Sequence, residues 1–132
     1  MGPGDFSMPF DYVRDDSVRR IRLTPTDPVT TAEMIEVVDR QLADGAWGYG
    51  TLVDARSIAS PTASTDLQAF MEHFRELVAA HGPRGPLVVV TRTSGVIGTT
   101  QKYALLGGTA GRDFDVFWDV RDAENWLGAR MA

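Results

Sequence analysis

Hydrophobic side chains recur at spacings of three and four residues along one segment in the middle of the chain. They are Leu67, Phe70, Met71, Phe74, Leu77 and Val78. This spacing predicts a helix with one apolar face against a sheet, and Gly82 and Pro83 are typical of its end. The preceding run 51–54 predicts a buried strand. A strand followed by such a helix indicates a parallel or mixed sheet covered by helices.

The remaining pattern divides into further short strands and helices. Strands are predicted at 10–14 and 18–24, joined by a turn at 15–17, and then at 86–91 and 114–118. Helices are predicted from Thr30 to Gly45, from Ser94 to Gly107, and from Asp122 onward. We therefore expect an α/β fold in the order ββαβαβαβα, with a mixed sheet of about five strands covered by about four helices. Residues 1–9 are expected to form a flexible tail and residues 10–132 a single domain.

Three of these elements carry a more specific pattern. Thr30 and Glu33 form a capping-box signature at the start of the first helix, whose buried stripe we expect at Ile35, Val38 and Leu42. The run 86–91 is apolar without alternation, which is typical of a strand covered on both faces. In the second strand only Ile21 and Leu23 form an apolar face, which predicts a strand near the edge of the sheet.

Composition and charge exclude several classes of function. The 132-residue chain has no cysteine, so disulfides and thiol chemistry are absent, and its net charge is -5 without a basic stripe. An acidic surface of this kind disfavours nucleic acid as a partner. No apolar run reaches the roughly 20 residues of a membrane span. With no basic and apolar blocks at its start, the chain is expected to be cytoplasmic and not to insert into a membrane.

Polar residues follow the predicted parallel strands, at the edge where open α/β sheets bind ligands. The candidate ligand-binding residues are Asp54, Arg56, Arg92, Ser94, Gly95, Gly98 and Thr99, and Asp119 follows the last strand. The segment 94–100 begins a helix with two glycines and several hydroxyls, so its backbone N–H groups are either an anion site or an ordinary helix start capped by Ser94.

Asp54 and Arg56 lie two residues apart on the same side of an extended segment. We interpret them as an ion pair. The alternative is that Arg56 grips the carboxylate or phosphate of a ligand through two hydrogen bonds.

Other chemically capable residues have structural interpretations. His73 and His81 are two helical turns apart and cannot share a metal; we expect His73 in solvent and His81 at the end of its helix. Ser94 lacks the Gly-x-Ser-x-Gly pattern of a nucleophile elbow. Trp47, Trp118 and Trp126 are interpreted as core or subunit contacts. We predict no catalytic residue, no metal and no cofactor.

Three stretches together resemble a known family. They are the strand ending in Asp-x-Arg at 52–56, the glycine followed by an aromatic-bearing helix at 98–103, and the strand–aspartate–helix ending at 116–119 with Trp-Leu-Gly at 126–128. The chain thereby resembles the STAS domain, and more closely the small SpoIIAA-like bacterial proteins. The resemblance covers nearly the whole chain from residue 10. It implies a domain that binds partner proteins or small ligands without chemistry of its own.

The resemblance also gives Thr65 a second interpretation. From the residues alone, 65–68 is a capping box that opens the long helix. Regulatory STAS proteins have an Asp-Ser-Ser-Gly turn at this place, whose second serine is phosphorylated, and Thr65 is the matching acceptor. Here Ala63 replaces the aspartate and Asp66 replaces the glycine of that turn.

Two functions follow as expectations. The first is a non-enzymatic interaction domain that binds a protein partner or pairs with itself as a homodimer. The alternative is a carrier or sensor of a small apolar or anionic ligand, such as a lipid or nucleotide, bound near the carboxyl ends of the parallel strands. An enzyme, the third class, would have to use Asp54, Asp119 and Ser94.

Overall fold

The computed structural model describes residues 10–26, 29–58, 64–92 and 114–131. Its elements are β1 (Phe10–Asp15), β2 (Arg20–Pro25), α1 (Thr31–Ala43), β3 (Gly50–Asp54), α2 (Ser64–His81), β4 (Leu87–Val90), β5 (Phe114–Phe117) and α4 (Val120–Met131). The α/β class and the five-stranded mixed sheet are confirmed. The helix expected from Ser94 and the tail expected at 1–9 lie outside the described residues.

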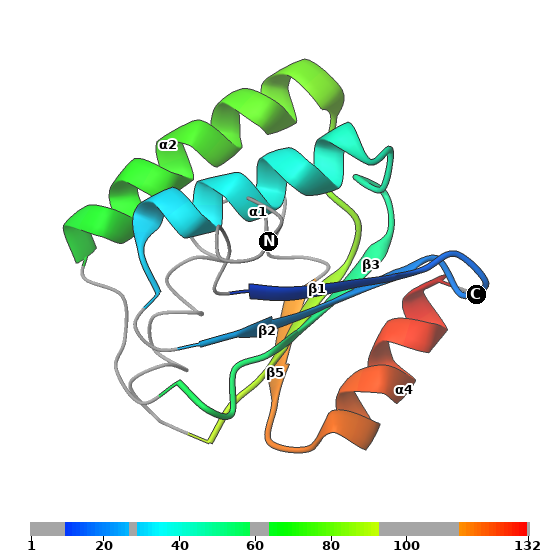
Figure 1. Ribbon diagram of the computed structural model, residues 1–132. Coiled ribbons are helices and arrows are strands. Elements are labelled where there is room, and N and C mark those ends of the chain that lie inside the picture. The colour runs from blue at the N-terminus through cyan, green and yellow to red at the C-terminus, as the bar shows by residue number, and fades with distance from the viewer. Residues whose placement is uncertain (1–9, 27–28, 59–63, 93–113, 132) are drawn as a thin grey trace, which may run out of the picture.

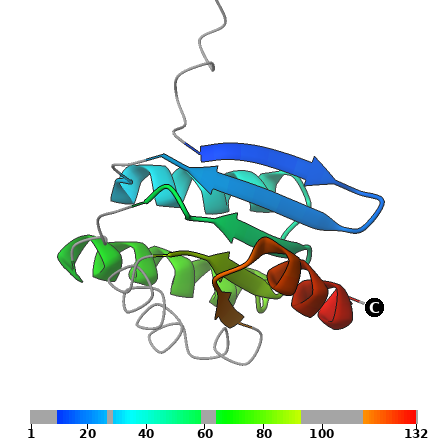
Figure 2. The same ribbon diagram turned by 90° about the horizontal axis from the view of Figure 1, so that it is seen from below.

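The strands lie in the sheet in the order β1-β2-β3-β4-β5. β1 pairs with β2 in the antiparallel direction, and each later pair is parallel. Seen from below, β1 forms one margin of the sheet and β5 the other (Figure 2). The carboxyl ends of β2 to β5 therefore meet along one edge.

The predicted hairpin is present, but β2 begins at Arg20 and not at residue 18. The reason lies in the turn 16–19, where Arg19 has a φ of 52°. A left-handed residue cannot continue a strand, so Val18 stays in the turn and is exposed. Ile21 and Leu23 form the buried face, as predicted, one strand from the edge.

Helices cover both faces of the sheet. Figure 1 shows α1 and α2 on one face and α4 on the other. On the α4 face, Leu52, Val88 and Val90 pack against Ala123 and Leu127 of α4. All four residues of β4 are buried, which confirms the prediction of a strand covered on both faces.

The apolar face of α2 is buried, as expected from its spacing. Phe70, Met71 and Phe74 are buried in one cluster with Val38 of α1 and with Trp47, and Leu77 and Val78 lie at its margin. The side chain of Leu67 lies outside the description. The cluster shows that α2 packs on α1 and on Trp47, which lies in the loop before β3.

α1 contacts both the sheet and α2, which explains why its buried stripe is wider than predicted. Val38 is buried, while Ile35 and Leu42 are only partly buried against α2. Val37 and Gln41 are buried as well, and Val37 packs toward the sheet with Ile21 and Leu23. The capping box of Thr30 and Glu33 is confirmed, and Gly45 (φ 72°) follows the end of the helix.

A buried polar network joins the loop before β3 to the loop before β4, and the sequence did not reveal it. The Gln41 side chain donates to the Ala46 carbonyl (2.9 Å) and to Thr51 Oγ1 (3.1 Å), and accepts from Arg84. Nearby, the Trp47 indole donates to the Gly82 carbonyl. The two loops are thereby held in close contact.

Gly85 supports a first prediction, because the loops leave no room for a side chain there. A Cβ on Gly85 would lie 2.4 Å from the carbonyl oxygen of Tyr49 and 2.5 Å from that of Gly48, both backbone atoms. We expect Gly85→Ala to lower the free energy of unfolding by about 1–3 kcal/mol, measured by urea denaturation. Gly48→Ala is the matched control, since a Cβ on Gly48 meets nothing within 4 Å. Equal losses in the two variants would contradict the packing described for these loops.

Candidate functional site

The register of the parallel strands brings several predicted site residues to one edge. Asp54 at the end of β3 is aligned with Val90 of β4, and Val90 with Phe117 of β5. Arg56, Arg92 and Asp119, which follow these strand ends, therefore belong to the same edge of the sheet. Ser94, Gly95, Gly98 and Thr99 lie outside the described residues.

Asp54 is the buried centre of this edge. Its side chain is 9% exposed, and it accepts from Arg56 twice, from Nε to Oδ1 at 2.8 Å and from Nη2 to Oδ2 at 2.7 Å. The backbone N–H of Arg56 also donates to Oδ1. The ion pair predicted for these residues is confirmed, and it has the two-point geometry in which arginine binds carboxylates most strongly.

A third member of the cluster, Arg22 on β2, was missed by the sequence reasoning. Its Nη2 donates to Asp54 Oδ2 at 3.3 Å, and its Nη1 lies 3.8 Å from Glu124 Oε1 of α4. The signal was present in the alternation of β2, because a residue between the buried Ile21 and Leu23 must point to the other face. The alternation alone does not predict that Arg22 contacts Asp54, because that contact depends on the register of β2 against β3.

The charges around Asp54 favour its ionised form. Hydrogen bonding to Arg56 lowers the pKa of Asp54 from 3.8 to about 2, against the opposing effect of burial, and Arg22 contributes further. In return, Asp54 raises the pKa of Arg56, and Asp119 adds to this effect. A carboxylate held in this way is a weak base, so the cluster is suited to fixing the position of Arg56 rather than to accepting protons.

Asp119 has a local structural role. Its Oδ1 accepts from the N–H of Arg121 at 2.7 Å, and its carbonyl accepts from Ala123 at 3.1 Å. This capping explains why α4 begins at Val120, two residues before the predicted start at Asp122. The preceding residue, Trp118, is 59% exposed.

The tryptophans and histidines divide between core and surface. Trp47 is buried and Trp126 is half-buried against Phe117, as the core interpretation predicts, but Trp118 does not lie in the core. His73, predicted to lie in solvent, is partly exposed, and its Nε2 lies 2.8 Å from Asp39 Oδ1 of α1, a surface contact that joins the two helices. His81 lies in the last turn of its helix, as expected.

Thr65 remains untested in both of its interpretations. The helix α2 begins at Ser64, and the side chains of its first four residues lie outside the description. Over the part of the chain that is described, no group of three or more histidine, aspartate or glutamate side chains could hold a metal ion. Nor does any described helix have the length and apolarity to cross a membrane.

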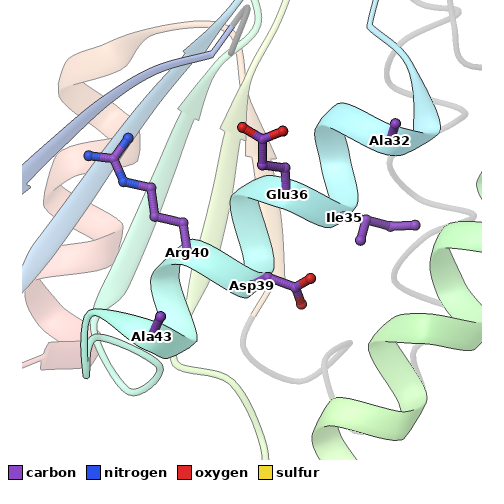
Figure 3. A pocket seen from close by; sticks show the side chains of 6 residues that line it. All are labelled: Ala32, Ile35, Glu36, Asp39, Arg40 and Ala43. Carbon is purple, nitrogen blue, oxygen red and sulfur yellow. The ribbon is translucent and has the colours of Figure 1, made fainter. Parts of the chain in front are cut away.

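An open depression of about 550 Å³ lies along α1, away from the Asp54 edge. Figure 3 shows its labelled side chains, all from α1, with Arg40 extending toward the sheet and Ile35 toward α2. The lining residues are Ala32, Ile35, Glu36, Asp39, Arg40 and Ala43. Two of them are already engaged, because Asp39 pairs with His73 and the Arg40 guanidinium lies 4.0 Å from the ring centre of Tyr12.

Comparisons of the chain with models of protein families, with curated proteins and with solved structures found no match. The site therefore has to be interpreted from its own residues.

The Asp54 cluster supports a prediction of pH dependence. Because the folded pKa of Asp54 lies below its ordinary value of 3.8, its stabilising effect is complete above about pH 4 and is lost as the pH falls toward 2. Asp54→Asn should lower the free energy of unfolding by about 1–2 kcal/mol at pH 7. This value already allows for solvent screening, because Arg56 and Arg22 are partly exposed.

The difference between Asp54→Asn and the native chain should shrink as urea denaturation is repeated from pH 5 to about pH 2.5. Glu72→Gln, at an exposed position on α2, serves as the control and should cost little at any pH. A difference that stays constant down to about pH 2.5 would show that the loss has another cause than the charge of Asp54.

Proposed function

We propose that this protein is a non-enzymatic interaction domain of the STAS type, which binds a protein partner or a second copy of itself. The observation that carries this proposal is the exposure of Trp118 beside a charged cluster. Trp118 is 59% exposed at the carboxyl edge of the sheet, and its neighbour Asp119 interacts electrostatically with Arg56. Arg92 is exposed at the end of the neighbouring strand.

The physical reason is the composition of protein interfaces. Tryptophan and arginine are the side chains most enriched among residues whose truncation strongly weakens binding. A large indole in water leaves apolar area that association would bury. The two-point bond to Asp54 fixes the Arg56 guanidinium in advance, so little further conformational entropy would be lost on binding.

The resemblance to STAS and SpoIIAA-like proteins supports the same proposal. The five-stranded mixed sheet is compatible with it. Asp54 and Arg56, the Asp-x-Arg pair of the stretch 52–56, form an ion pair at the carboxyl edge of that sheet. Phosphorylation of Thr65, a homodimeric state and a cytoplasmic location remain predictions from the sequence.

The alternative, a carrier or sensor of a small apolar or anionic ligand, has less support in the geometry. Arg56 would have to grip an anion through two donors, yet its Nε and Nη2 both donate to Asp54. An anion would therefore have to displace a bond to a carboxylate that lies next to it. The predicted backbone site at 94–100 lies outside the described residues.

The interaction domain can be tested with Trp118→Ala. Sedimentation velocity on the native chain measures self-association, and an immobilised native chain measures capture of a partner from extract of the source cells. We expect Trp118→Ala to weaken the association about tenfold or more, as truncation of a buried aromatic contact does. Thermal unfolding should be little changed, because an exposed side chain contributes little to stability.

Val18→Ala is the matched control for this experiment. Val18 is also apolar and is 47% exposed, but it lies in the β1–β2 turn. Its substitution should leave the association unchanged. The proposal would be overturned if the native chain stays monomeric and captures no protein that Trp118→Ala fails to capture. A rise in melting temperature with a lipid or nucleotide would then favour the carrier.

A further inference from the structure

The outer edge of β1 is a separate feature, at the opposite margin of the sheet from β5. β1 pairs with β2 on one side, and among the described strands none pairs with its other side. Alternate residues of such an edge direct N–H and C=O groups outward, where another extended chain can bond to them. What this edge can accept depends on the side chains above and below it.

On the α1 face, the side chains of β1 are already engaged. The Tyr12 hydroxyl donates to Asp44 Oδ2 at 2.9 Å, and the Arg40 guanidinium lies over its ring. Arg14 donates to Asp16 Oδ1 and to the Asp44 carbonyl, each at 2.6 Å. These bonds hold β1 against the end of α1 and against its own turn.

On the α4 face, β1 presents an exposed row of acid, apolar and acid side chains. Val13 is aligned with Arg22, whose contacts with Asp54 and Glu124 define this face, and it is 50% exposed. Asp11 and Asp15, two residues to either side, share the face and are exposed. α4 packs chiefly over β3, β4 and β5, so it leaves this row open.

The charges in the row are only partly balanced within the chain. Asp15 is aligned with Arg20 on β2, and its side chain accepts from the Ser17 hydroxyl. Asp11 is aligned with Thr24, which carries no charge. Opposite charges in directly opposed cross-strand pairs are stabilising, and like charges are destabilising. An added strand therefore gains most from basic residues opposite Asp11 and Asp15.

We propose that β1 docks an extended segment of a partner protein, which continues the sheet and carries the pattern basic–any–apolar–any–basic. Its apolar side chain covers Val13, and its basic side chains lie opposite Asp11 and Asp15. The segment runs antiparallel to β1, the pairing that is more stable per residue and places side chains directly opposite one another. This surface is distinct from the Trp118 edge and does not depend on the function proposed for it.

A second copy of the chain fits this edge poorly. An antiparallel pair of β1 strands that keeps each face continuous puts no basic side chain of β1 opposite Asp11 or Asp15, because their face of β1 carries only Asp11, Val13 and Asp15. The register centred on Val13 places Asp11 of each copy opposite Asp15 of the other. Two pairs of like charges then face one another across the new ladder, which is destabilising. The charge pattern thus selects a foreign basic strand.

The test uses synthetic peptides as probes and isotope-labelled full-length protein. A peptide Thr-Lys-Thr-Val-Thr-Lys-Thr should shift the backbone amide signals of residues 10–15 in NMR titrations. The matched peptide with glutamate in place of both lysines should bind more weakly by a factor of about ten or more. Two further basic peptides are N-methylated, one on its even-numbered amides and the other on its odd-numbered amides. Only one of these two sets of amides bonds to β1, so one peptide should lose binding and the other should keep it.

A charge reversal on the protein completes the test. Asp11→Lys should weaken binding of the basic peptide and strengthen binding of the acidic one. Glu72→Lys, with the same charge change at an exposed position on α2, should leave both affinities unchanged. The proposal is overturned if the basic peptide does not bind, if both peptides bind equally, or if its signal shifts lie away from β1. Retention of binding by both N-methylated peptides would overturn it too.

Discussion

The middle strands of the sheet are buried from both sides, and the rest of the structure follows from this constraint. Val88 and Val90 pack against Ala123 and Leu127 of α4, while Leu87 and Val89 cluster with Ala55 and Ile58 of the loop that follows β3. Both faces of β4 therefore need an apolar cover, and α4, which follows β5, supplies it on one of them. α4 packs over β3, β4 and β5, and the β1–β2 end of its face carries polar residues around the exposed Val13.

Burial on both faces also determines where polar groups can lie. Asp54 lies in a buried strand at 9% exposure, and without Arg56 and Arg22 its charge would be costly there. Gln41 and Thr51, fully buried, satisfy one another, and Arg84 completes the set. Asp54 and Gln41 each also tie segments that are far apart in sequence, through Arg22 and Arg84. These bonds set the relative positions of helices and strands more narrowly than apolar packing alone does.

Much of the fold could be predicted from the sequence because the signals are local. The spacing along α2, the capping box at Thr30 and the unbroken run in β4 each depend on residues within a few positions. The pairings in the site could not be predicted in this way. Arg22 and Asp54 are 32 residues apart, His73 and Asp39 are 34 apart, and Arg84 and Gln41 are 43 apart. Their contacts require the strand register and the helix packing, and neither is present in a local pattern.

Arg19 shows the same limit of local prediction at the boundary of a strand, and its contacts anchor the hairpin turn. A left-handed arginine costs about 1–2 kcal/mol relative to an ordinary conformation, and local propensity argues against it. Here its carbonyl accepts from the N–H of Gly50 at the start of β3, and its guanidinium lies over the Tyr49 ring. Arg14 contacts the same ring. The turn is therefore anchored to the next strand, and with Tyr12 bonded to Asp44 the α1 face of the hairpin is fixed. A strand held in place on one face can offer its outer edge at a lower entropy cost than a loose one, because its backbone is already ordered.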